Sequence, residues 1–185
     1  MNHLTRLLKA RIMKKIFIAL TLAICFSAAV AQSQETTVSE DQEVAVALQN
    51  EFWGSILGKT SKHDVKAKLE SRKLSSSEYG SSIILDAPTL DGLNYTYASM
   101  DFDEDVLSSV TFMKSGLSKE DAIVFSKAIY GNFADKYVMI KTHVDGFECY
   151  FTNVGTTTCT IYITQTEYGY TTSVCYEYGT VKLKN

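Results

Sequence analysis

The chain has 185 residues, of which 45% are hydrophobic and 21% charged, and its formal net charge is −3. This length suits one domain with its own hydrophobic core, or two small units that share a sheet. The chain lacks the basic surface with which a protein neutralises phosphates, so we expect no nucleic acid as a partner.

The first 31 residues have the pattern of a secretory signal peptide. Two lysines precede an apolar run over residues 16–30, and the small residues Ala29 and Ala31 stand at positions −3 and −1 before the expected cleavage. The run is shorter than the roughly 20 residues that a spanning helix needs. We therefore expect no membrane span, cleavage after Ala31 and a periplasmic or secreted protein. Because Met13 can begin a complete signal peptide by itself, residues 1–12 are compatible with a spurious extension.

Cys25 offers an alternative, because the residues before it resemble the lipobox at which bacterial lipoproteins are acylated. Ile24 stands where a small residue is usual, so we expect no lipid anchor at Cys25. Without residues 1–31, 13 basic residues face 21 acidic ones, a net charge of about −8. Residues 32–42 are polar and aperiodic and predict a disordered leader to an α+β domain over residues 43–185.

Two similar stretches predict helix starts. Ser61 precedes Asp64 by three residues, and Ser118 precedes Asp121 in the same way, each before an apolar stripe. The separation of 57 residues suggests a tandem duplication with units over 51–116 and 117–185, although capping sequences also recur by chance. Residues 43–53 are compatible with a third short helix, and residues 52–58 with a first strand.

Alternating aromatic and β-branched residues predict strands after each helix start. The expected strands cover residues 81–86, 93–102, 106–113, 136–144, 147–152, 157–166 and 170–178. Asp145-Gly146 is the pair that a type I′ hairpin turn prefers. We expect a two-layer α+β fold, with two or three helices on one face of a mostly antiparallel sheet.

The alternation also predicts which residues face the core. A turn at residues 153–155 would place Cys149 opposite Cys159 on the inner face, and would turn Cys175 outward. The exposed face would then carry Tyr150, Thr160, Tyr162 and Thr164. Tyrosine gives a large contact area at low entropic cost, so this face is a candidate protein-binding surface, against the alternative of an ordinary wetted sheet face.

Cysteines in an exported chain meet oxidising conditions, so Cys149 and Cys159 are candidates for a cross-strand disulfide. The alternative, which we favour, is that both are buried free thiols. His143 is the one candidate base for a cysteine nucleophile, and no flanking motif supports that pair.

The acidic run Asp101, Asp103, Glu104 and Asp105 resembles a calcium loop but lacks the glycine and the final acid of an EF-hand, so we expect an acidic hairpin turn. His63 and His143 lack zinc-ligand spacing. No catalytic motif stands out. We therefore expect no metal, no cofactor and no catalytic residues, and a protein that acts by binding, most simply to another extracytoplasmic protein. The alternative is a ligand-binding or hydrolytic protein whose site is assembled from distant residues.

One short stretch resembles a known family: Gly58-Lys59-Thr60, followed by Val65 and Leu69. This stretch is similar to the start of the first helix in small outer-membrane-assembly lipoproteins, which belong with the β-lactamase-inhibitor-protein-like fold. The resemblance covers residues 52–178 and implies tandem helix-and-sheet units and a binding role. The chain lacks the matched cysteine pairs of that fold, so no inhibitory or assembly role is carried to any residue.

Overall fold

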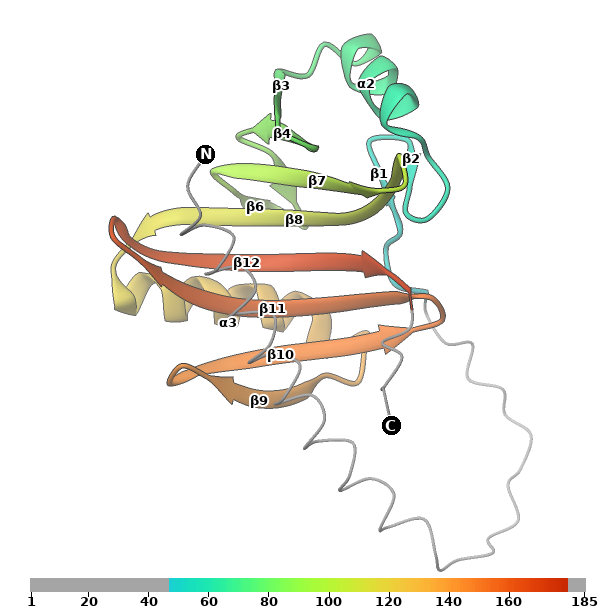
Figure 1. Cartoon of the computed structure of the whole chain (residues 1–185). Helices are drawn as coiled ribbons and strands as arrows, with labels where there is room; N and C mark the ends of the chain where they lie inside the picture. Colours follow the sequence, from blue (N-terminus) through green and yellow to red (C-terminus); the bar gives the residue numbers. More distant parts are fainter. Residues whose placement is uncertain (1–46, 180–185) are drawn as a thin grey trace, which may run out of the picture.

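A computed structural model describes residues 47–179, which form an antiparallel sheet with two helices (Figure 1). The α+β class expected from the sequence is confirmed. The signal peptide, Cys25 and the leader over residues 32–42 lie outside the described residues. The helices are α2 (Lys62–Ser71) and α3 (Lys119–Ala134).

Eight strands form the main sheet. They are β3 (Ser76–Tyr79), β4 (Ser82–Asp86), β7 (Tyr97–Asp103), β8 (Val106–Leu117), β9 (Ile140–Val144), β10 (Phe147–Val154), β11 (Thr157–Thr166) and β12 (Gly169–Tyr178). Two short hairpins lie outside this sheet and comprise β1 (Glu51–Phe52), β2 (Ser55–Ile56), β5 (Thr89–Leu90) and β6 (Leu93–Asn94).

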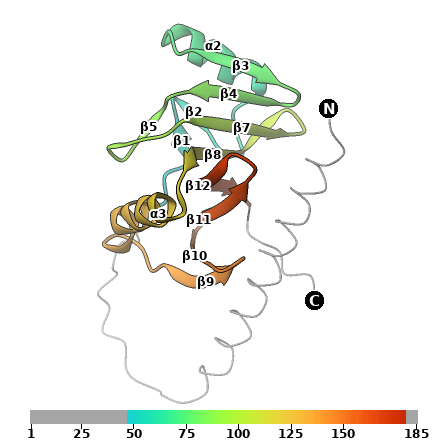
Figure 2. The same cartoon turned by 90° about the vertical axis from the view of Figure 1, so that its left-hand side faces the viewer.

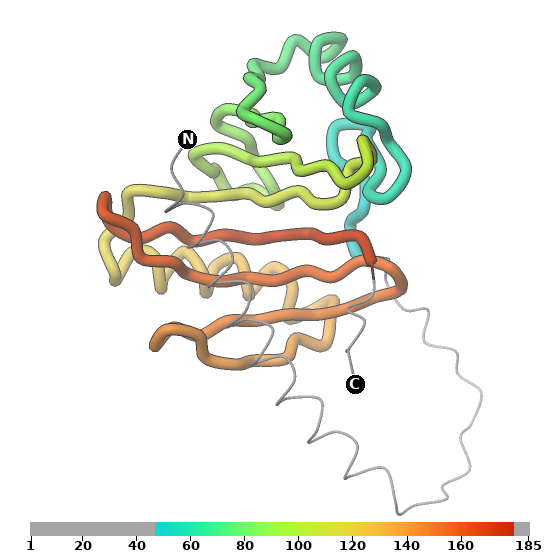
Figure 3. Tube along the Cα trace, in the orientation of Figure 1, coloured from blue at the N-terminus to red at the C-terminus, as the bar shows by residue number. Residues whose placement is uncertain are grey.

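The order of the strands divides the sheet into two halves. It runs β3-β4-β7-β8-β12-β11-β10-β9. Each half therefore contains one helix followed in the chain by four strands of the main sheet, and in the first half the β5–β6 hairpin is inserted among them. The last strands of the halves, β8 and β12, pair in the middle. The trace in Figure 3 follows the first half and then the second. We call the halves unit 1 (α2 to β8) and unit 2 (α3 to β12).

The core is continuous across this central pair. Phe112 of β8 lies opposite Val174 of β12, and Val110 lies opposite Tyr176. All four side chains are buried in one cluster that includes residues of both helices. The Phe52 ring packs edge-on to Tyr176, with ring centroids 4.9 Å apart. Aromatic rings in such contacts bury a large apolar area. The β1–β2 hairpin therefore covers the core where the two units meet.

Both helix starts follow the predicted capping pattern. The Ser61 hydroxyl accepts a hydrogen bond from the Asp64 amide at 3.2 Å and donates to its carboxylate at 2.9 Å. Ser118 makes the same pair with Asp121, at 3.1 Å and 2.7 Å. Each hydroxyl satisfies an amide that the helix leaves free, and each acid is favourably placed at a helix N-terminus.

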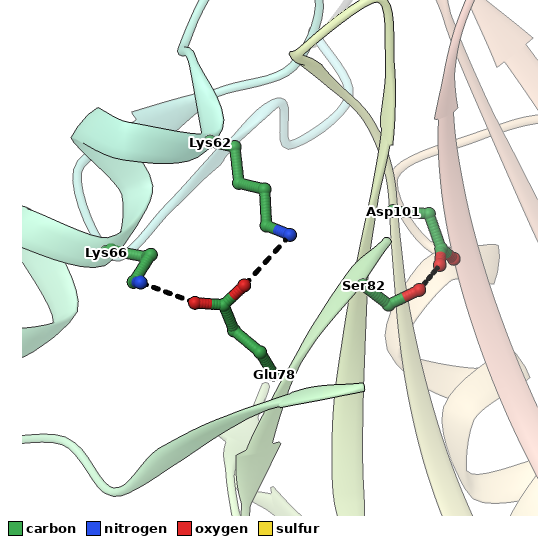
Figure 4. Close-up of polar contacts among 5 residues, drawn as sticks. All are labelled: Lys62, Lys66, Glu78, Ser82 and Asp101. Carbon is green, nitrogen blue, oxygen red and sulfur yellow. Dashed lines mark hydrogen bonds and ion pairs between the residues drawn. The ribbon is translucent and has the colours of Figure 1, made fainter. Parts of the chain in front are cut away.

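The two helices are fastened to the sheet by different contacts. On α3, the Ala122 carbonyl accepts a hydrogen bond from the Thr172 hydroxyl of β12 at 3.0 Å, and α3 runs alongside β11 and β12 (Figures 1 and 2). On α2, Lys62 and Lys66 both reach the Glu78 carboxylate of β3 (Figure 4). These lysines, Lys66 first, hold the pKa of Glu78 below its usual range.

The expected inner face of β10 is wrong. The turn to β11 has two residues, Gly155 and Thr156, because Val154 pairs with Thr157. The sequence predicted a turn at residues 153–155. In the structure, each β10 residue lies opposite a β11 residue that is displaced from the expected partner by an odd number of positions. Such a shift exchanges the two faces of a strand. Tyr150 therefore lies opposite Ile161 on the core side, while Cys149 and Phe151 fall outside the core cluster, on the other side of the strand.

Other boundaries differ from expectation in smaller ways. The edge strand β3 was not predicted, because its residues are polar and all exposed and give no alternation. The expected strand over 93–102 is divided into β6 and β7. The Asp145-Gly146 turn has the expected positive φ at both residues, and the acidic run forms a hairpin turn with positive φ at Glu104 and Asp105.

One glycine is required by a close approach. Gly58, after β2, has a φ of +73°, and a Cβ at this position would lie 2.5 Å from the Tyr178 ring. A side chain here would be strained by this backbone and would have to displace the Tyr178 ring. The first hairpin therefore packs directly against the end of β12.

Replacing either cap is expected to lower stability. Ser118→Ala and Ser61→Ala should each reduce the free energy of unfolding by about 1 kcal/mol, because a helix amide loses its acceptor. Urea unfolding monitored by circular dichroism measures this loss. Ser77→Ala, on an exposed position of β3, is the control and should change little. Unchanged midpoints for both cap variants would contradict the capping role.

Candidate functional site

A pocket of about 320 Å³ opens between α3 and the outer strands of unit 2. Helix α3 contributes Ile123, Ser126 and Lys127, which share one helix face because they lie three and four residues apart. The strands and the β9–β10 turn contribute the opposite wall, formed by His143, Gly146, Phe147, Glu148, Tyr150 and Ile163. The volume of the pocket and its combination of polar and apolar lining residues suit a small molecule.

A polar network closes one wall of the pocket. The Glu148 carboxylate accepts hydrogen bonds from the Lys141 ammonium and from the Tyr150 hydroxyl. Lys141 first, and then Tyr150, lower the pKa of Glu148. Burial, followed by the bond to Glu148, raises the pKa of Tyr150 to about 12. The Tyr150 ring stacks on Tyr130 of α3, with centroids 4.3 Å apart, so this wall packs directly against the helix.

Ser126 is the unusual residue of this site. Its side chain is 3% exposed, and its hydroxyl has no hydrogen-bond partner within the described residues. The nearby Ala122 carbonyl, four residues earlier and the usual acceptor for a helical serine, already accepts from Thr172. A buried hydroxyl without a partner costs about 1–3 kcal/mol, so a residue of this kind beside a pocket is a candidate ligand contact.

The positive charge of the pocket is only partly compensated. Glu148 is already paired with Lys141. Lys127, on the opposite wall, makes no ion pair within the residues that the structure describes, although its charge contributes to the lowered pKa of Glu148. The Lys119 ammonium lies 5.5 Å from the centre of the Phe147 ring. The site therefore presents ammonium groups that a negatively charged ligand could approach.

The equivalent place in unit 1 is filled. Counting from the two caps, Leu69 of α2 corresponds to Ser126 of α3, and Leu69 is 1% exposed and part of the core. Lys62 and Lys66 of α2 form ion pairs with Glu78 and so connect the helix to the edge strand β3 (Figure 4). Unit 2 thus has a serine where unit 1 has a large apolar side chain, and an open pocket beside it.

The four residues of the predicted binding face do not lie together. Thr160, Tyr162 and Thr164 are half-buried on the β11 face that points away from Ile161 and the core. Tyr150 lies on the other side, is 4% exposed, and lines the pocket instead. The predicted face therefore loses Tyr150.

Cys149 and Cys159 are not bridged in the part of the chain that the structure describes, and their expected cross-strand pairing is wrong. Cys159 lies opposite Thr152, not Cys149, and the register places Cys149 and Cys159 on opposite faces of the sheet. Burial raises the pKa of the Cys149 thiol to about 11 and that of Cys159 well above its usual range. His143 lies opposite Glu148 in the ladder, and Cys149 lies opposite Thr142.

Residues 47–179 contain acidic side chains and histidines that could in principle bind a metal ion. No group of three or more His, Cys, Asp or Glu side chains in this range is arranged to hold a metal ion. The Asp101 carboxylate is instead occupied by serine hydroxyls, including that of Ser82 (Figure 4). Neither described helix is long and apolar enough to cross a membrane.

The sequence contains one signal for the pocket. Ser126 falls between Ala122 and Ile129 on the buried side of α3, where an apolar residue is expected. Lys127 and Glu148 gave no local signal, because they come together only through the packing of α3 on β10.

The comparisons with known proteins add no identification. No family model matches the chain, and no similar curated protein or solved structure was found.

The register predicts the state of the cysteines in solution. Proteolysis of unreduced protein followed by mass spectrometry should yield no peptide in which Cys149 is linked to Cys159, because their side chains point to opposite sides of the sheet. The reduced sample, as control, should give the same peptide map for this region. A linked peptide that disappears on reduction would contradict the register.

Proposed function

We propose that this protein binds a small amphipathic molecule, without transforming it, in the pocket between α3 and β9–β11. The observation that carries the proposal is Ser126, a residue that lines the cavity and whose buried hydroxyl has no partner among the described residues. A ligand with a polar group would satisfy this hydroxyl, while Ile123, Phe147 and Ile163 offer apolar contacts.

The pKa shifts favour binding over acid–base catalysis. A general acid or base works best with a pKa near neutrality. In this pocket, the pKa of Glu148 is lowered and that of Tyr150 is raised to about 12, so both move away from neutrality. These two groups support the wall of a binding site better than they would serve as proton donor and acceptor.

The proposal places the protein in the periplasm or outside the cell, after cleavage following Ala31. Its support is the sequence of the first 31 residues alone, with its basic start, its apolar run and its small residues before the cleavage site.

A second candidate function is protein binding through the sheet face that carries Thr160, Tyr162 and Thr164. It is favoured because the described helix α3 contacts the opposite side, through Thr172 and Ala122. Without Tyr150 this face has less of the aromatic area that protein-binding surfaces use, so we rank it below the pocket.

We also propose that units 1 and 2 arose by duplication and that both helices cover the same face of the sheet. The matching hydrogen bonds at Ser61 and Ser118 support this, as does the order of one helix and four main-sheet strands in each unit. This arrangement agrees with the resemblance to the β-lactamase-inhibitor-protein-like fold.

Filling the pocket should remove binding. Ser126→Leu copies Leu69 of unit 1 and replaces an unpartnered hydroxyl with an apolar group, so the thermal midpoint should stay the same or rise. Amide NMR spectra recorded with mixtures of short-chain acids, alcohols and amines should show shifts at Ser126 and Gly146 in the unmodified protein and none in the variant.

Ser77→Leu, at an exposed position of β3, makes the same chemical change away from the pocket and should bind as the unmodified protein does. Equal shifts in Ser126→Leu and the unmodified protein, or no shifts in either, would contradict the proposal.

A further inference from the structure

We propose that the ligand of this pocket is an organic monocarboxylate with a short apolar tail, its carboxylate bound by the Ser126 hydroxyl and the Lys127 ammonium. This inference rests on the proposed function and adds the chemical class of the ligand. It follows from which polar groups of the pocket already have partners and which have none.

The one lining carboxylate is already compensated. Glu148 accepts hydrogen bonds from both Lys141 and Tyr150, so a cationic ligand would compete with an existing ion pair. The Ser126 hydroxyl has no hydrogen-bond partner in the described structure, and the exposed Lys127, the next residue of α3, makes no ion pair there; both residues line the pocket. Two such donors fit the two oxygens of a carboxylate, and a hydrogen bond to a charged group is stronger than one between neutral groups.

The charges around the pocket point the same way. Lys119, Lys127 and Lys141 approach it from α3 and β9, against Glu148 on β10. His143 lines the rim, and Asp145 stands in the turn just before Gly146. Because the whole chain has a net charge of −3, non-specific attraction would not favour an anion, so any preference for one must arise locally.

The apolar residues that line the pocket determine the chemistry of the ligand's tail. Ile123 on α3, Phe147 on β10 and Ile163 on β11 border the same cavity of about 320 Å³. A short alkyl chain that packs against them would be removed from contact with water, and each buried methylene contributes favourably to binding. A branched or aromatic tail of similar size would satisfy the same contacts.

Three probes with the same tail and different head groups test the proposal. Calorimetric titration of the purified protein at pH 7 with octanoate, octan-1-ol and octylamine should show octanoate binding about tenfold tighter than octan-1-ol, with octylamine weakest. Lys127→Gln should weaken octanoate about tenfold and leave octan-1-ol unchanged. Lys73→Gln, the same charge change at an exposed residue after α2, should alter neither.

The outcomes separate the two proposals. If octan-1-ol and octanoate bind equally well, or if Lys127→Gln binds octanoate as the unmodified protein does, recognition of the carboxylate is overturned while the pocket stands as a ligand site. If none of the three probes binds the unmodified protein, both the ligand class and the proposed function are overturned. Ser126→Ala, which keeps the helix and the cavity, should weaken octanoate several-fold and octan-1-ol less.

Discussion

The antiparallel pairing of β8 with β12 is the contact on which the rest of the structure depends. It joins two four-stranded sheets into one and brings Phe112 and Tyr176 into a common core. A slip of one residue in this pairing would turn Val174 and Tyr176 out of the core and break the contacts with the first hairpin. The position of α3 depends on the same register, because the Thr172 hydroxyl of β12 donates a hydrogen bond to the Ala122 carbonyl of the helix.

The pocket is explained by a difference between two similar units. In unit 1, Leu69 and the ion pairs of Glu78 close the space between helix and sheet. In unit 2, the corresponding helix position is Ser126, and the acid of the adjoining strand, Glu148, is turned to Lys141 and Tyr150. One half of the sheet therefore serves as a closed scaffold, and the other keeps room for a ligand. Sites that depart from the local rule for burial are often functional.

Local signals in the sequence predicted the elements well and the faces less well. The serine caps and the Asp145-Gly146 turn were found because their geometry is determined by neighbouring residues. The face of β10 was wrong because it depends on whether the next turn has two or three residues, and Gly155 is compatible with both. The pocket could not be predicted from the sequence, because its walls meet only when α3 packs on β10 and β11.

The contact between Gly58 and the Tyr178 ring joins the segment that precedes α2 to the end of β12. The Gly58 amide also donates a hydrogen bond to the Leu107 carbonyl of β8 at 2.8 Å. One backbone position outside the main sheet therefore touches both of its central strands, and a side chain there would displace Tyr178 of unit 2 while the turn is held by Leu107 of unit 1.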